Sequence, residues 1–336
     1  MNRISKTQFY SLLLINDVFV LFCISGSISL VTAAGFAAGT LIQFIISIPI
    51  IQIYRNGREL KECGKTAGII LLLGVLMWGG ALFSMLRRTG EIVFVPFKGA
   101  GIWGQLIVTV IIALVCVYIS SSGIKALARS AVIAAALGAI CLAVVAVSAA
   151  INSDIENLHT ADSNGFFREL VKGIALSGGM ISFIVLAGFV RGNVRGAAYG
   201  YFGVKAVVTS FVLIVGVLVS GGIMKITDFP IVTAAQLSQP FPVQRIDSLF
   251  LIVFTVFAVY SIAVQASAAE FVLTETIPFI KKYRCSLMLL IMAAAGYLTG
   301  GKNFYGITAA IIPVFIILAV PGIYHMKRLL KGGQGR

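Results

Sequence analysis

The chain has 336 residues, of which 59% are hydrophobic and 11% are charged, and its formal net charge is +14. Soluble domains carry about 25% charged residues. This composition, with a mean hydropathy of +1.02, therefore excludes an ordinary soluble protein and indicates an integral membrane protein.

Apolar runs follow one another along the whole chain. A membrane-spanning helix needs about 20 consecutive apolar residues, and the sequence predicts ten such helices at residues 8–31, 36–54, 66–86, 101–121, 127–151, 170–190, 199–223, 247–271, 286–300 and 304–326. Strands of a membrane barrel would alternate in hydrophobicity over about ten residues each, whereas these runs are continuous. The first run is longer than the apolar core of a signal peptide, although the small residues near Thr32 leave cleavage open as an alternative.

The basic residues divide unequally between the two sides of this predicted bundle. With the N-terminus inside, 18 of the 26 Lys and Arg residues fall in inner segments, among them Arg191, Arg195 and Lys205. Cytoplasmic segments carry such an excess, so we expect both termini in the cytoplasm, at the cell membrane or an equivalent inner membrane. The net charge then faces anionic lipid headgroups, and no nucleic-acid partner is expected.

The first apolar run contains an acid, Asp17, and a helix-weakening triplet, Ser25, Gly26 and Ser27. A carboxylate at bilayer depth is costly unless it faces the bundle interior or is protonated. Asp17 is therefore either a partner for a ligand, cation or proton, or an acid neutralised by protonation or by a neighbouring helix. We take it, with the triplet, as part of a candidate ligand site.

A similar interruption occurs in the sixth run, at Ser177, Gly178 and Gly179. Gly and Ser pairs are places where helices bend or unwind. Interrupted helices at matching positions of two halves indicate an inverted-repeat transporter with a site near the midplane. Close packing of helices through small residues is the alternative explanation.

The outer loop at residues 152–169 divides the runs five and five. We therefore expect a single transmembrane domain over residues 1–336, with a first repeat at 8–151 and a second at 170–326. The expected fold is all-α, with ten transmembrane helices in a five-plus-five inverted repeat in which helices 1 and 6 are broken.

The eighth run carries a polar stripe that includes Tyr260, Ser261 and Gln265. Ser261 and Gln265 are four residues apart and share one face of a helix. They either line a cavity or hold two helices together. We include all three in the candidate ligand site.

Catalytic and metal-binding signatures are missing from the sequence. The five cysteines form no CxxC pair, and no HExxH, Walker A, GxSxG or dinucleotide-binding fingerprint occurs in a credible context. We expect no enzyme, no catalytic residue, no metal site and no cofactor.

Three stretches carry a family resemblance: "RISKTQF" at residues 3–9, "NSDIENL" with "NGFFRELVKG" within 152–173, and "QLSQPFPVQRIDSLFLIVF" at 236–254. Together with the predicted helices they resemble the spore germination permeases. These are the B subunits of nutrient germinant receptors, within the amino acid–polyamine–organocation superfamily.

This resemblance implies the LeuT-like form of the five-plus-five inverted repeat. It also implies recognition of a small germinant, often an amino acid, in the spore inner membrane. It also implies two partners, a larger A-type membrane subunit and a C-type lipoprotein subunit. The chain departs from the family pattern in the sixth run, where "FIVLAG" at residues 183–188 lacks the acid of the usual Gly–Glu pair, and in having no Pro after the first interruption.

Two other functions stay open from the sequence. One is a stand-alone amino acid permease coupled to protons or Na⁺, which needs no partner subunits. The other is an assembly protein of the membrane that binds no ligand.

Overall fold

A computed structural model of the chain describes residues 3–26, 28–55, 65–93, 101–151, 157, 166–176, 181–220, 228–237, 247–276, 284–299, 319 and 322. Within these residues the regular structure is helical, apart from one isolated bridge between Ile4 and Val190. The helices are α1 (Lys6–Phe22), α2 (Leu30–Arg55), α3 (Lys65–Val93), α4 (Gly101–Ser121), α5 (Ile124–Ile151), α6 (Phe166–Leu176), α7 (Ile181–Ala187), α8 (Val194–Ser220), α9 (Pro230–Leu237), α10 (Asp247–Thr276) and α11 (Arg284–Thr299). The expected all-α fold is confirmed.

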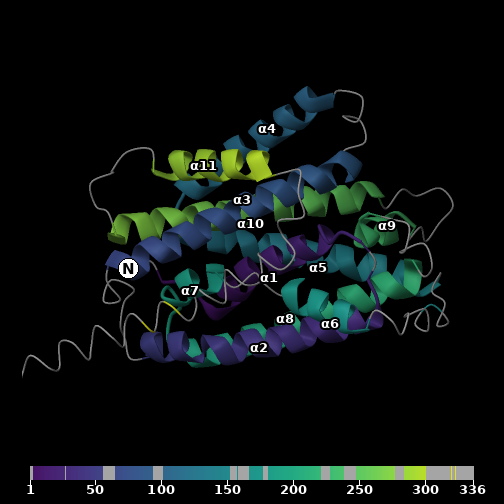
Figure 1. Cartoon of the computed structure of the whole chain (residues 1–336), viewed down its shortest axis with the longest axis horizontal. Helices are drawn as coiled ribbons and strands as arrows, with labels where there is room; N and C mark the ends of the chain where they lie inside the picture. The colour runs from purple at the N-terminus through teal and green to yellow at the C-terminus, as the bar shows by residue number, and fades with distance from the viewer. Residues whose placement is uncertain are drawn as a thin grey trace, which may run out of the picture.

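Two groups of helices lie on either side of α1 (Figure 1). In one group α3 packs against α10 and α11, and in the other α2 packs against α6 and α8. Between them α1 contacts α5, α8 and α10. Its sequence is apolar on nearly every face, and from Leu12 to Phe22 only Leu14 is not buried. A helix that is apolar all round belongs inside a bundle, and α1 occupies that position.

The start of α1 is fixed by local hydrogen bonds. The Ser5 hydroxyl accepts from the backbone N–H of Gln8 at 3.3 Å, and the Gln8 side chain accepts from the backbone N–H of Ser5 at 2.9 Å. This reciprocal capping box satisfies two N–H groups that a helix start leaves open. Just before it, the N–H of Ile4 donates to the carbonyl of Phe189 at 2.9 Å, which joins the entry of α1 to the segment after α7.

Five helices of the described part are long and apolar enough to cross a membrane: Leu30–Tyr54, Lys65–Gly90, Ile124–Val147, Val194–Val219 and Leu249–Thr276. Shorter apolar helices at Leu106–Ser121 and Cys285–Leu298 correspond to the fourth and ninth predicted runs. The tenth predicted run, at 304–326, lies outside the described residues except for Ala319 and Gly322. The expected membrane protein is thus confirmed.

The first predicted run needs a correction. Helix α1 ends at Phe22 and α2 begins at Leu30, so Ser25 and Gly26 lie in a connection between two helices and not inside one membrane span. Gly26 has φ of +78°, a conformation that favours glycine, and its N–H donates to the carbonyl of Asp228 at 2.9 Å. Ser25 and Gly26 therefore follow the end of a helix, where we predicted an interruption within one.

Candidate functional site

Aromatic rings join α1 to α10 and show how the two helices run. Phe19 contacts Phe254 with ring centroids 5.5 Å apart, and Phe22 contacts Phe250 at 4.9 Å. As residue numbers rise along α1, the rings that they contact on α10 have falling numbers, so the two helices are antiparallel. Residues three or four apart share a helix face, so Asn16 lies one turn before Phe19 on this face of α1, and Ser261 lies two turns after Phe254 on this face of α10.

Asp17 lies on the other side of α1, in a buried ion pair with α8. Its Oδ1 is 3.0 Å from Nζ of Lys205, and its Oδ2 accepts from the Tyr201 hydroxyl at 2.6 Å. Tyr201 and Lys205 are four residues apart and share one face of α8. Lys205 Nζ also donates to Gln43 Oε1 of α2 at 3.3 Å. One carboxylate therefore connects α1 with α8 and, through Lys205, with α2.

The position that we predicted for Lys205 from the distribution of charges is wrong. We assigned it to an inner segment near Arg191 and Arg195, but α8 begins at Val194 and Lys205 is fully buried within it. At 1.5 Å per residue, Lys205 is about 16 Å along the helix from Val194. Buried charges persist when they are paired, and Asp17 is that partner. The sequence did contain a sign of this pair, because Lys205 lies inside the predicted apolar run 199–223.

Asn16 of α1 and Ser261 of α10 are two of the buried polar side chains that lack partners among the described residues. Both side-chain polar atoms of Asn16 and the hydroxyl of Ser261 are buried, and within the described part of the chain they form no hydrogen bond. Native interiors seldom leave polar groups unpaired, and each exception needs an explanation such as water or a ligand. Each of these two side chains could therefore gain hydrogen bonds from a polar molecule.

Gln265 extends this polar group toward α7. Its side-chain nitrogen donates to the Ser182 hydroxyl, whereas its Oε1 is buried without a partner among the residues that the structure covers. Asn16, Ser261, Gln265 and Ser182 are all fully buried. We call these four side chains the polar set. The helix-joining reading of the Ser261 and Gln265 face is found in the bond from Gln265 to Ser182, and the cavity-lining reading stays a prediction.

Other predicted site residues lie elsewhere. Tyr260 is partly buried and packs against the core beside Ser261, without a place in the polar set. Ser25 and Gly26 lie beyond the C-terminal end of α1, where a Cβ on Gly26 would come 3.6 Å from Lys172 Nζ of α6. Asp17 precedes Gly26 by nine residues and does not share its surroundings.

The remaining predicted residues cannot be placed. Ser27, Ser177, Gly178 and Gly179 lie outside the described residues. The structure gives the bounds on either side of the second interruption, with α6 ending at Leu176 and α7 beginning at Ile181.

The residues of the polar set offer amide and hydroxyl groups, which bind polar ligands by donating and accepting hydrogen bonds. None of them is a nucleophile with a neighbouring base. Asn16 and Ser182 were not predicted. Asn16 adjoins Asp17 in the first apolar run, and its polar character there was the available signal.

Comparison with known sequences decides the family. Residues 41–305 match the family described as spore germination protein, which is well over half of the chain. The chain belongs to the spore germination permease family. A comparison with curated proteins gave no match.

Solved structures show what fold this spore germination permease has. The crystal structure of MhsT in complex with L-phenylalanine resembles it with a TM-score of 0.58 at 17% identity, covering 95% of this chain and 87% of that one. At this identity the likeness shows the fold, which is that of the LeuT-type transporters. The family and fold are those of permeases.

Proposed function

We propose that this permease recognises a small amino acid at the polar set, as the permease-like B subunit of a spore germinant receptor. The observation that carries the proposal is that buried polar atoms of Asn16 on α1, and of Ser261 and Gln265 on α10, have no hydrogen-bond partner among the described residues. Family membership supports the germination role, and the L-phenylalanine bound to MhsT supports an amino acid as ligand.

The architecture we propose for this function has ten transmembrane helices in two repeats, 8–151 and 170–326, within one domain, with cytoplasmic termini. In it α6 and α7 together form the sixth span, interrupted at the positions of Ser177, Gly178 and Gly179. The chemistry of the ligand follows from the polar set, whose neutral groups suit the polar ends of an amino acid. Because Lys205 already pairs with Asp17, we assign Asp17 to the α1–α8 connection and not to the ligand's ammonium.

Binding would signal by changing the balance between two arrangements of the helices. A ligand shifts such a balance only as far as its affinities for the two arrangements differ. The A-type and C-type subunits would read the shift.

The test is a thermal-shift screen of the twenty amino acids on the purified chain. A ligand that binds the native state raises the melting temperature in a dose-dependent manner. Asn16→Leu should abolish the shift while leaving the fold intact, since replacing an unpaired buried polar group costs little. Ser130→Ala is the matched control, because its hydroxyl bonds only to carbonyls of its own helix among the described residues. A shift that survives in Asn16→Leu would contradict the proposed site.

A stand-alone ion-coupled amino acid permease is the second candidate, and the LeuT-type fold favours keeping it. Uptake of a labelled amino acid into proteoliposomes, driven by a proton or Na⁺ gradient, would establish it. Binding without uptake, together with co-purification of A-type and C-type subunits, would support the receptor.

A further inference from the structure

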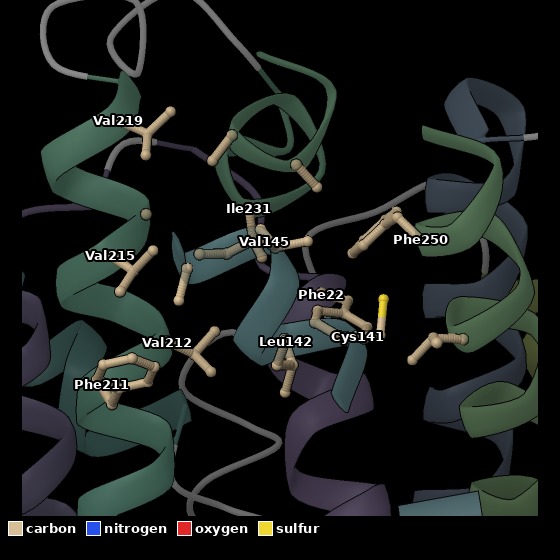
Figure 2. A pocket seen from close by; sticks show the side chains of 15 residues that line it. Phe22, Cys141, Leu142, Val145, Phe211, Val212, Val215, Val219, Ile231 and Phe250 are labelled. Atoms are coloured by element: carbon tan, nitrogen blue, oxygen red, sulfur yellow. The ribbon is translucent and has the colours of Figure 1, made fainter. Parts of the chain in front are cut away.

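An apolar pocket lies between α5, α8, α9 and α10, next to the end of α1 (Figure 2). It has about 510 Å³ of free space, part of which is open to the surroundings. Valines of α8 and Phe250 of α10 lie across the pocket from each other, with Ile231 of α9 near one end and Leu142 of α5 between them. Among the described residues that line it, none has a nitrogen or oxygen in its side chain, and the most polar group is the thiol of Cys141.

The open part of the pocket continues into the membrane-facing surface. Phe211 lines the pocket and is also 51% exposed. Val144 and Val147 of α5, which flank the lining residues Val145 and Ala146, are also exposed apolar side chains. In a membrane protein such surface faces lipid chains. A hydrocarbon chain can therefore enter the pocket from the bilayer without crossing water.

The chemistry of the lining restricts the occupant. An amino acid would lose its hydrogen bonds with water and find no side-chain partner, which is costly. Apolar cavities of this kind also stay free of water and accept apolar molecules. The polar set is a separate site, because Asn16 lies about 9 Å along α1 from Phe22, which lines the pocket.

We propose that this pocket binds one acyl chain of a membrane phospholipid. Phospholipid is the occupant because the pocket opens among lipid-facing side chains, where acyl chains are the surrounding solvent. The occupant touches α9 through Ile231, Ala234 and Ala235. The backbone N–H of Gly26 donates to the Asp228 carbonyl just before α9. By packing against α9, the bound acyl chain would therefore also stabilise the α1–α2 connection.

The test is photolabelling of the full chain in vesicles of phosphatidylethanolamine and phosphatidylglycerol. A small fraction of the phosphatidylglycerol carries a diazirine in one acyl chain, and labelled residues are mapped by mass spectrometry. Val215→Phe fills the pocket from α8, and Val207→Phe is the matched control, the same change at an exposed position of the same helix. The larger side chain in Val215→Phe should displace about two methylene groups of the acyl chain, which should lower labelling of the pocket residues about ten-fold.

The expected result is labelling at Leu142, Val212 and Val215 that falls in Val215→Phe and persists in Val207→Phe. Label confined to lipid-facing residues such as Leu137, or pocket labelling unchanged by Val215→Phe, would overturn the proposal. Pocket labelling by the same diazirine chain as a free fatty acid, but not as phospholipid, would overturn phospholipid as the occupant. If Val215→Phe does not fold, Ile231→Trp fills the pocket from α9 and gives the same readout.

Discussion

The buried pair of Asp17 and Lys205 predicts a strong and non-additive effect on stability. At 3.0 Å and an effective dielectric constant of about 20, two unit charges attract by roughly 5–6 kcal/mol, which largely offsets the cost of burying them. Removing one partner leaves the other charge buried and unpaired, which typically costs about 3–5 kcal/mol. Asp17→Asn and Lys205→Met should each lower the free energy of unfolding by that amount. The double variant should recover much of the loss, because neither charge remains.

The assay is reversible unfolding by SDS in mixed micelles, followed by tryptophan fluorescence, for the wild type, both single variants and the double variant. We expect a coupling free energy above about 1 kcal/mol, the sign of residues in direct contact. Lys125→Met is the control, since it removes a Lys charge from an exposed position of α5 and should change stability by less than about 0.5 kcal/mol. Single effects as small as that of the control, or effects that simply add, would refute the pairing.

Three further predictions concern packing, capping and one interhelical hydrogen bond, all measured as the free energy of unfolding in the same assay. A Cβ on Gly35 of α2 would overlap the backbone oxygen of Leu170, so Gly35→Ala should cost about 1–3 kcal/mol. The control is Gly203→Ala, which should be neutral or stabilising because nothing lies within 4 Å of a Cβ there. Equal effects of the two changes would contradict the close approach of Gly35 to Leu170. Ser5→Ala removes the capping box of α1 and should cost about 1 kcal/mol. Tyr54→Phe removes the 2.7 Å hydrogen bond from α2 to a carbonyl of α7 and should cost about 1 kcal/mol.

The helices of this chain could be predicted because their signal is local. The continuous runs at 101–121 and 199–223 correspond closely to α4 and α8, since helix formation and membrane burial both depend on apolar residues in sequence. The end of α1 could not be placed correctly, because a glycine and two serines weaken a helix equally well in its middle and at its end. Helix α9 was missed, since its eight residues are too few for any span.

The candidate site could be predicted only in part, because most of its contacts join distant segments. The common face of Ser261 and Gln265 follows from helical spacing, and the structure has it. The partners of Asp17 come from α8 and α2, and no local pattern specifies which helices meet. The positive-inside rule placed Lys205 wrongly for the same reason, because it counts charges by segment and does not recognise a buried pair.

The two sides of α1 differ in a way that bears on how a ligand would act. Toward α8, the ion pair and the Tyr201 hydrogen bond hold α1 firmly. Toward α10, aromatic contacts lie on the same faces as polar atoms of Asn16 and Ser261 that have no partner in the described part of the chain. A ligand in the polar set would supply hydrogen bonds to these atoms on the α10 side. We therefore expect α1 to move as one body with α2 and α8, and ligand binding to favour the arrangement in which this body closes on α10.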